Sequence, residues 1–245
     1  IVGAVERLGL VKQAIVHSGV GWQAYGGAAV QIVGGKGSVL ARSLDVHLDE
    51  EDLRGKDCWG GLDLASTEDV TALALIFPEE REIPEGFRDP WNALAPTHQT
   101  ILKILPYFWV PRDNMPRFYK KNPMANYAEW VRQGDMTATH GNTFDQEYVL
   151  NKILELAKIF NIKRICYDRW NATGLTTKLD SDGIEMEPFG QGYQSMNAPT
   201  KEMVKRVASS RIEHPNNQVL NWMAGNVAAE EDPKGYVKPS KKKST

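Results

Sequence analysis

Two aspartates, Asp63 and Asp168, are the residues whose surroundings point most directly to chemistry. Asp63 is the one carboxylate in the apolar stretch Cys58 to Ser66, and Asp168 directly follows the apolar run Ile162 to Tyr167. Because burying an unpaired carboxylate costs several kcal/mol, we expect Asp63 to have a partner: a basic side chain, a hydrogen-bond network or a metal ion. If the two runs are neighbouring strands, both acids lie near strand ends, where open α/β sheets collect ligands.

Two carboxylates that face each other repel unless a divalent cation neutralises them. Oxygen ligands without a cluster of Cys or His favour Mg²⁺ or Mn²⁺ over Zn²⁺, and two such ions roughly 3.5–4 Å apart activate water to cut a phosphodiester. In the alternative interpretation, Asp168 caps a helix that begins near Asn171. Asp69 reads first as a turn residue, and a role in supporting the metal ligands is its second interpretation. His140 and His214 lack metal-ligand spacing, which favours structural or surface roles.

The hydrophobic patterning predicts the elements that position the two acids. Residues 58–65 and 71–77 read as strands that pair as a hairpin, and a charged excursion follows over residues 78–98. Residues 100–110 read as a third strand, in which Pro106 indicates a bulge or an edge position. Residues 111–126 hold three prolines and several basic residues, so we expect a loop, and a short helix over residues 127–133.

A helix before Asp168 is the most secure element of the chain. Thr143 to Gln146 matches a capping box, and apolar residues recur behind it at helical spacing. A helix that leads into the strand at residues 162–167 implies parallel pairing, and therefore an α/β sandwich. Further on we expect helices over residues 173–180 and 198–210, a strand over residues 184–189, a helical turn over residues 219–223, and a hairpin with arms at residues 226–230 and 236–239.

The composition is that of a globular protein with one large domain, or one domain and an appendage. A net charge of −2 gives no global positive field, so any nucleic-acid surface must be a local patch. Cys58 and Cys166 fall in expected strands, which indicates buried thiols in a reducing compartment. No apolar run of membrane-spanning length and no Gly-x-Ser-x-Gly element occur. The glycine-rich residues 1–45 read as a linker or the remnant of a preceding region, and the start without Met indicates a fragment.

Several motifs together resemble a known family. Gly61-Leu-Asp63-Leu-Ala-Ser66, Asp69-Val-Thr-Ala-Leu and Tyr167-Asp-Arg-Trp-Asn171 look like the nuclease domain of the large terminase subunit of tailed phages, in its HK97-like branch. Gln191-Gly-Tyr, His214-Pro-Asn-Asn and Asn226-Val with the lysine-rich end are similar to it as well. The resemblance runs from about Trp59 to the C-terminus in the order of the family.

The resemblance implies a ribonuclease H-like fold for residues 46–245, a mixed sheet flanked by helices. It implies a divalent-metal-dependent endonuclease that cuts double-stranded DNA concatemers during phage genome packaging in the host cytoplasm. Asp63 and Asp168 are then the first two acids that bind Mg²⁺ or Mn²⁺ at a two-metal catalytic site. The third acid of the family follows the lysine-rich segment, so we expect a domain truncated at its C-terminus. The ATPase motor would precede residue 1, and the portal protein and the small terminase subunit are the implied partners.

Basic residues supply the candidate DNA contacts, because lysine–phosphate contacts give sequence-independent, salt-sensitive affinity. They are Lys238, Lys241, Lys242 and Lys243 near the end, Lys201, Lys205, Arg206 and Arg211 on or near one helix, and Arg169 beside Asp168. The terminal lysines also fit a merely solvated tail. Two other functions stay open: a junction resolvase or transposase-like nuclease of the same fold, and a non-catalytic module that docks on the portal or on DNA.

Overall fold

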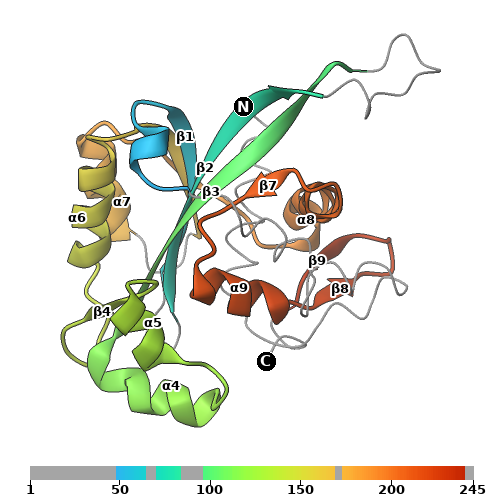
Figure 1. Cartoon of the computed structure of the whole chain (residues 1–245). Coiled ribbons are helices and arrows are strands. Elements are labelled where there is room, and N and C mark those ends of the chain that lie inside the picture. The colour runs from blue at the N-terminus through green and yellow to red at the C-terminus, as the bar shows by residue number, and fades with distance from the viewer. Residues whose placement is uncertain (1–47, 65–69, 84–95, 169–172, 241–245) are drawn as a thin grey trace.

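The computed structural model describes residues 48–64, 70–83, 96–168 and 173–240. In these parts of the chain, seven strands form one mixed sheet in the order β4-β3-β2-β1-β5-β6, with β7 beside β3 (Figure 1). The strands are β1 Asp57–Asp63, β2 Thr71–Glu82, β3 His98–Pro111, β4 Thr137–Thr139, β5 Asn161–Tyr167, β6 Met186–Pro188 and β7 Ile212–Glu213. Residues 1–45, which the sequence assigns to a linker or preceding region, lie outside the described residues.

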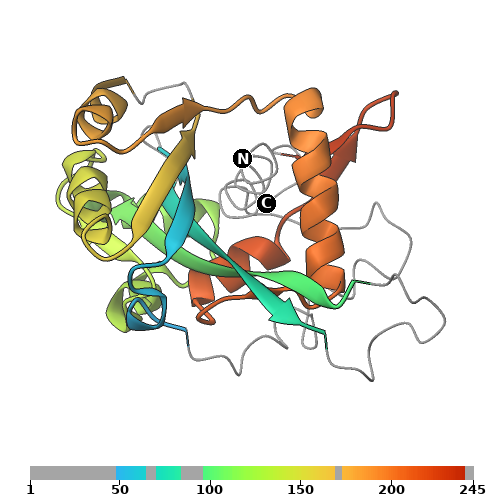
Figure 2. The ribbon, with the colours of Figure 1, turned by 90° about the horizontal axis from the view of Figure 1, so that it is seen from above.

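Helices cover both faces of the sheet, as Figure 2 shows from above. One face packs against α6 Glu147–Leu156, α7 Thr173–Ser181 and a 3-10 turn at Glu51–Leu53. The other packs against α4 Met115–Lys121, α5 Tyr127–Gln133, α8 Tyr193–Ala208 and α9 Gln218–Gly225. The expected α/β architecture, a mixed sheet flanked by helices, is confirmed. None of the described helices combines the length and apolarity needed to cross a membrane.

The alternation of side chains along β2 separates two hydrophobic cores. Leu73, Leu75 and Phe77 pack toward α6 and α7, whereas Ala72, Ala74 and Ile76 pack toward α8 and α9. Successive side chains of a strand point to opposite faces, so a strand buried on both faces reads as a continuous apolar run. This is why residues 71–77 are apolar at every position.

The expected pairings around β1 are confirmed. β1 pairs antiparallel with β2, and α6 carries the chain across to β5, which pairs parallel with β1. Pro106 lies in the middle of β3 and pairs opposite Ala74 of β2 without a bulge. On its other side, β3 contacts β7 at Leu102 and β4 from Trp109 onward, so Pro106 falls between these partners, where no described strand needs its missing N–H. The edge interpretation of Pro106 is therefore correct.

The hairpin of β2 and β3 is longer than the sequence predicts. Pairing continues to Glu82 opposite His98, and the ribbon projects past the rest of the sheet (Figure 1). On this ribbon the Glu79 carboxylate accepts hydrogen bonds from Lys103 Nζ (2.6 Å) and Arg81 Nη2 (2.8 Å), and these bonds lower the pKa of Glu79 to about 2. Arg81 also contacts Glu213 of β7 at 2.7 Å, which fastens the ribbon to the C-terminal half.

The prediction of a loop over residues 111–126 is wrong. A short 3-10 turn at Arg112–Asn114 leads into α4, and the helix is stable because Pro116 lies in its first turn, where the missing N–H costs no hydrogen bond. Phe118 is buried and its ring lies 5.6 Å from that of Tyr127 on α5. Proline here marks the start of a helix and not its absence.

Two helix starts also differ from the prediction. Thr143 is not the N-cap of α6, because the helix begins at Glu147 and the backbone N–H of Glu147 donates to Asp145 Oδ1 at 2.9 Å. α8 begins at Tyr193, five residues before the predicted start, and continues through Pro199. The two short strands β4 and β7 were not predicted. Their lengths of three and two residues give no periodic signal.

The C-terminal hairpin is confirmed. β8 Ala229–Glu231 pairs antiparallel with β9 Val237–Pro239, and the ribbon lies against α8. Its turn is held by Asp232, whose Oδ1 accepts hydrogen bonds from the backbone N–H groups of Lys234 and Tyr236, both at 2.9 Å. Gly235 occupies the left-handed region at φ 78°. The turn residues that the sequence displays are thus the ones that close the hairpin.

Candidate active site

Asp63 and Asp168 come together at the carboxyl ends of two neighbouring parallel strands. Asp63 is the last residue of β1, and Asp168 follows β5 directly. Leu62 pairs with Tyr167 in the parallel register, so the next residue on each strand is one of the acids. With adjacent strands about 4.8 Å apart, the two Cα atoms lie about 5 Å from each other.

The two acids also share one face of the sheet. Asp63 pairs opposite Ala72, and Ala72 packs into the core beneath α8 and α9. On β5, Cys166 faces this same core, and by alternation Asp168 does too. Both carboxylate residues are half-buried. The parallel pairing of β1 with β5 thus agrees with the expected placement of the acids at neighbouring strand ends, and their chemical role is taken up below.

Gly60 permits the close approach of β1 and β5. A Cβ atom at this position would lie 2.7 Å from Cγ1 and 3.2 Å from Cγ2 of Ile165, which is fully buried. Real Cβ contacts this short do not occur, so a side chain at Gly60 would push the strands apart or displace Ile165. The pair Gly60–Ile165 lies three residues before the acids and thus sets the spacing of the strands that carry them.

The start of α8 lies at the same edge of the sheet as the acids. β6 pairs with β5 up to Tyr167, whose carbonyl accepts a hydrogen bond from the backbone N–H of Phe189 (2.8 Å), and α8 begins at Tyr193. Lys238 of β9 lies over the Tyr193 ring at 4.8 Å and pairs with Glu230 at 3.4 Å. This cluster holds the C-terminal hairpin beside the edge of the sheet where Asp63 and Asp168 lie, which we call the acid edge.

Glu230 is the centre of that cluster. Its Oε2 accepts a hydrogen bond from Ser240 Oγ at 2.7 Å. Burial opposes ionisation of this carboxyl group, but hydrogen bonds from Ser240, Tyr193 and Lys238 outweigh burial and lower the pKa of Glu230. For Tyr193, partial burial and the neighbouring carboxylate of Glu230 raise the pKa. Glu230 therefore stays charged and keeps Lys238 in place.

The donor set at the acid edge consists of oxygen atoms. Among the described residues, no group of three or more His, Cys, Asp or Glu side chains is close enough to hold a metal ion. Two carboxylates suit Mg²⁺ nonetheless, because this ion is commonly bound by one or two protein carboxylates and completes its octahedron with water and phosphate oxygens. The chemistry of Asp63 and Asp168 thus fits a hard divalent cation at the edge of the sheet.

The comparison with protein families decides the identity. Residues 99–245, more than half of the chain, match the model of the terminase large subunit endonuclease domain. The chain belongs to this family. Protein YmfN of Escherichia coli (strain K12) is 27% identical to it over 205 residues, which cover 82% of this chain and 42% of YmfN. The large terminase subunit of Enterobacteria phage HK97 is 27% identical over 189 residues, which cover 76% of this chain and 34% of the HK97 protein.

The crystal structure of the HK97 bacteriophage large terminase superposes with a TM-score of 0.66 at 24% identity, over 84% of this chain and 39% of the HK97 chain. This likeness shows a shared fold, and the terminase endonuclease domain is ribonuclease H-like, as the sequence predicts. The chain spans less than half the length of the relatives it matches.

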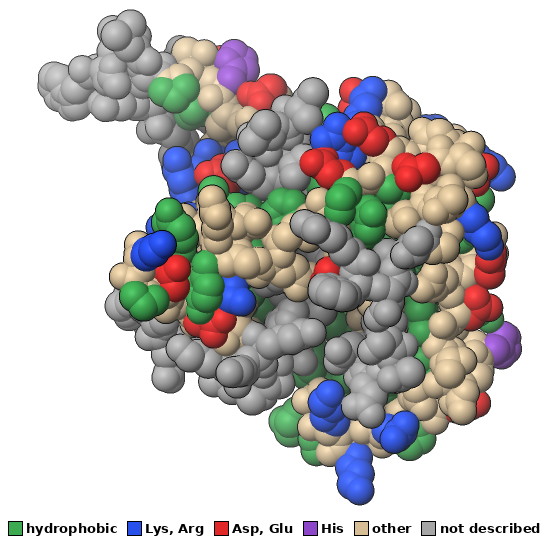
Figure 3. Space-filling view, turned by 180° about the vertical axis from the view of Figure 1, so that it is seen from behind, with side chains coloured by type: hydrophobic (Ala, Val, Ile, Leu, Met, Phe, Trp, Pro, Cys, Tyr) green, Lys and Arg blue, Asp and Glu red, His purple; other side chains and the backbone are tan. Residues whose placement is uncertain are grey.

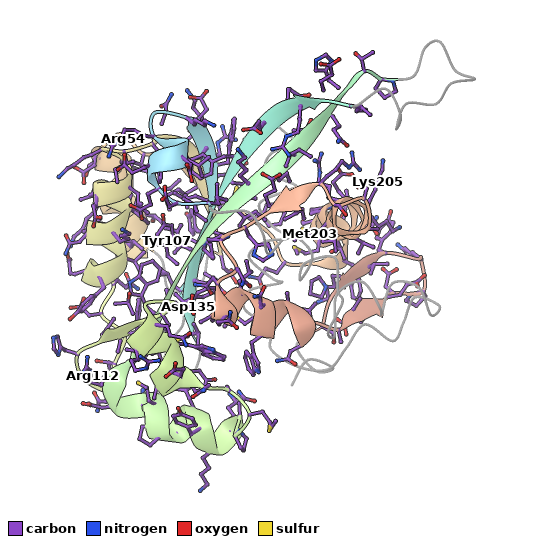
Figure 4. All side chains as sticks on the ribbon, viewed as in Figure 1. Arg54, Tyr107, Arg112, Asp135, Met203 and Lys205 are labelled. Atoms are coloured by element: carbon purple, nitrogen blue, oxygen red, sulfur yellow. The ribbon has the colours of Figure 1, made fainter. Side chains whose placement is uncertain are left out.

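The basic residues proposed to contact DNA on this terminase domain differ in exposure. Lys201 and Lys205 are exposed on α8, where Figure 4 labels Lys205. Arg206 is only 5% exposed; its Nη1 donates to the Thr100 carbonyl at 2.8 Å and its Nε contacts Glu202 at 2.7 Å. The structure argues against a DNA contact of Arg206, because the guanidinium is enclosed and already bonded.

Three more of these cations are partly engaged within the domain, and one of them is Lys201, whose Nζ donates to the Gly235 carbonyl at 3.3 Å. Lys238 is bound to Glu230 and Tyr193, as described above, and Arg211 donates from Nε to Ser209 Oγ at 2.6 Å. The remaining predicted positions lie outside the described residues: Asp69, Arg169, Lys241, Lys242 and Lys243.

The His-Pro-Asn-Asn motif has a structural role in the terminase domain. His214 is fully buried and His140 is exposed, in agreement with the roles predicted for them. Asn217 caps α9: its Oδ1 accepts from the backbone N–H of Leu220 at 3.0 Å, and its Nδ2 donates to the carbonyl of Asp135 at 2.9 Å.

Asp135 lies between α5 and α9 (Figure 4). Burial raises the pKa of its carboxyl group, against the effect of a hydrogen bond from the Gln218 backbone. Sequence reasoning missed the cap at Asn217, although an Asn directly before the apolar run of α9 is a known helix-start signal.

Proposed function

We propose that this terminase domain is a divalent-metal-dependent endonuclease that cuts double-stranded DNA, with Asp63 and Asp168 as metal-binding catalytic residues. One observation carries the proposal: β1 and β5 pair in a parallel register that brings both acids to one edge and one face of the sheet. Family membership supports a nuclease role, and the geometry supports these two acids as its site. We further propose residues 46–245 as the extent of the nuclease domain.

A bound divalent cation would supply charge at the scissile phosphate and a nucleophilic water at neutral pH. The contribution of the chain is positioning. β1 and β5 hold the two carboxylates about 5 Å apart at Cα, a spacing that lets their oxygen atoms share one ion or bracket two. Both acids are only half-buried, so their side chains remain partly exposed. Water is the nucleophile, and the phosphodiester is hydrolysed without a covalent intermediate on the protein.

Family membership supports a proposal for the substrate and the partners. We propose concatemeric phage DNA in the host cytoplasm as the substrate, and the portal protein and the small terminase subunit as partners, with an ATPase motor feeding the DNA. Lys201 and Lys205 of α8 are exposed on the helix that starts at the acid edge, which suits contacts to phosphate. Such contacts give affinity without sequence preference.

The test is plasmid cleavage by the purified chain while Mn²⁺ or Mg²⁺ is titrated. We expect cleavage that requires the metal and is lost in Asp63→Ala and in Asp168→Ala. Asp57→Ala is the matched control, because Asp57 is an exposed acid at the opposite end of β1 and should leave cleavage unchanged. Binding of Mn²⁺, followed by its paramagnetic resonance signal, should weaken in the two site variants and not in the control.

Several outcomes would overturn the proposal. Cleavage that survives both site substitutions removes the site assignment. DNA binding without cleavage at any metal concentration favours a non-catalytic docking module. A strong preference for branched junctions over linear duplex would favour a junction resolvase.

A further inference from the structure

A second group of cations lies on and just before α4, away from the basic residues considered so far. Arg112 of the preceding turn and Arg117, Lys120 and Lys121 of the helix are all exposed, and we call these four residues the α4 basic face. The three helix residues have i, i+3, i+4 spacing and therefore project from one side. Figure 3 shows Lys and Arg side chains gathered at the lower end of the molecule, where α4 lies in Figure 1.

The α4 basic face stands on a fixed platform. On the inner side of the helix, Phe118 is buried against Tyr127, and the Tyr119 hydroxyl accepts a hydrogen bond from the backbone N–H of Ala128 at 3.0 Å. Before the helix, Asn114 Nδ2 donates to the carbonyl of Asn142 at 2.6 Å. A helix fixed along its inner side and at its start presents its cations at set positions, so the entropy cost of ordering them when a ligand binds is small.

Three of the four cations of this face are not neutralised by a carboxylate within the part of the chain that the structure describes. In the described parts of the chain, Arg112, Arg117 and Lys120 make no ion pair, whereas Lys103 and Arg164 are paired with carboxylates. Like charges one helical turn apart destabilise a helix. Exposed cations that no described carboxylate neutralises, here Arg112, Arg117 and Lys120, are suited to an external anion.

The topology places the face at the same end of the sheet as the acid site. Asp63 is level with Ala72 on β2 and with Phe108 on β3, so it lies two strands, or roughly 10 Å, from β3. β3 runs in the same direction as β1 and ends at Pro111, roughly 10 Å beyond Phe108, where the turn with Arg112 begins (Figure 4). The α4 basic face therefore lies roughly 15–25 Å from the acids, less than the ~34 Å of one duplex turn.

The face and the acids are also on the same side of the sheet. Phe118 of α4, Tyr127 of α5 and Ala72 of β2 belong to one core, and Asp63 shares the face of Ala72. A duplex with a phosphate at the acids thus has further phosphates within reach of α4.

We propose that the α4 basic face binds the phosphate backbone of double-stranded DNA and holds the duplex across the carboxyl edge of the sheet. This inference rests on the proposed nuclease function and adds to it a second anchor, separate from α8 and the tail. Backbone contacts of this kind set the position and direction of the duplex without reading its sequence.

The test compares two triple variants of the 245-residue chain. One is Arg117→Gln with Lys120→Gln and Lys121→Gln. The matched control is Lys56→Gln with Lys158→Gln and Lys163→Gln, which removes three exposed lysines near the amino ends of β1 and β5, at the opposite edge. Fluorescence anisotropy would measure the affinity of each for a linear duplex without metal, over a range of NaCl concentrations. Circular dichroism would check that both variants are folded.

If all three cations contact phosphate, the slope of log affinity against log salt should fall by about 2.7 in magnitude in the α4 variant. Over a fourfold rise in salt, the wild-type affinity should then drop about 40-fold more than that of the variant. The control should keep the wild-type slope. Equal slopes for the α4 variant and the wild type, or an equal loss in the control, would overturn the inference.

The two proposals fail in different ways. If the wild type cuts and binds duplex but the α4 variant keeps its salt dependence, only the inference about α4 is wrong. If the wild type neither binds nor cuts duplex under any condition, the nuclease proposal and the inference both fall.

Discussion

Replacing Gly60 by alanine tests whether the spacing of β1 and β5 controls the acid pair. The new Cβ would lie 2.7 Å from Ile165 Cγ1, so the strands must separate or the isoleucine must leave its rotamer. Overpacking of this kind costs about 1–3 kcal/mol, and about 0.5–1 kcal/mol returns because alanine restricts the unfolded chain more than glycine does. We therefore expect a net loss of about 0–2.5 kcal/mol of folding free energy, which lowers the Tm by up to roughly 10 °C.

The effect on cleavage should be larger than the effect on stability. A displacement of the acids approaching 1 Å can reduce a rate by about 100-fold, so Gly60→Ala should cut DNA far more slowly even where it is fully folded. Thermal unfolding by circular dichroism and metal-dependent plasmid cleavage measure the two effects separately. Gly174→Ala is the matched control: no atom lies within 4 Å of its added Cβ, and in helix α7 it should stabilise the fold by up to about 1 kcal/mol.

A double-mutant cycle with Ile165→Ala isolates the contact. Removing Cγ1 and Cγ2 of Ile165 takes away the two shortest contacts of the new methyl group, so the double variant should lose less stability than the sum of the single variants, by about 1–3 kcal/mol. If Gly60→Ala is as stable and as active as Gly174→Ala, or if the cycle shows strict additivity, the argument that Gly60 sets the strand spacing is refuted.

Three further predictions concern other contacts. Glu79→Gln should lower the free energy of unfolding by about 1 kcal/mol at neutral pH, after allowance for solvent screening. The folded pKa of Glu79 is about 2, below its ordinary 4.5, so the wild type loses this stabilisation as the pH falls from 4.5 toward 2. The difference in Tm between the wild type and the variant should therefore narrow over that range. Asn217→Ala should lower the free energy of unfolding, measured with urea, by about 1–2 kcal/mol. Asn217→Asp should lower it less, because aspartate still accepts the hydrogen bond from Leu220 but cannot donate one to the Asp135 carbonyl. Cys58 and Cys166 are buried, and burial raises the pKa of the Cys58 thiol to about 12, so a thiol reagent should modify them only on unfolding; rapid reaction of the native protein would contradict this.

The acid edge was predictable because its signals are local. Each acid ends or follows an apolar run, and the helix directly before β5 has the length of a parallel crossover, so a parallel place for β5 in the sheet was predictable. That β1 is its partner was only a hypothesis until the strand order was known. The tight contact of Gly60 with Ile165 was not predictable. It depends on a register shift between Cys58 and Trp59 that no property of these side chains reveals.

Other features needed tertiary information or a closer reading. α4 forms in a proline-bearing stretch because Phe118 finds a partner on α5, a contact that local propensity does not contain. The burial of Arg206 had a sign in the sequence: Met203 and Val207 flank it at i−3 and i+1, so all three lie on one side of α8, the side that packs into the core. A cation on an apolar helix face is better read as a buried structural residue than as a DNA contact.

The position of β1 between β2 and β5 determines the stage of synthesis at which the two acids can come together. A nascent polypeptide that has emerged only as far as the β2–β3 ribbon holds a single acid on a bare strand edge, roughly a hundred residues ahead of its companion. The second carboxylate reaches the first only after α6 has folded and β5 has paired with the free edge of β1. The cutting centre that we assign therefore cannot exist on a half-made chain, and its completion reports that the middle of the sheet has closed.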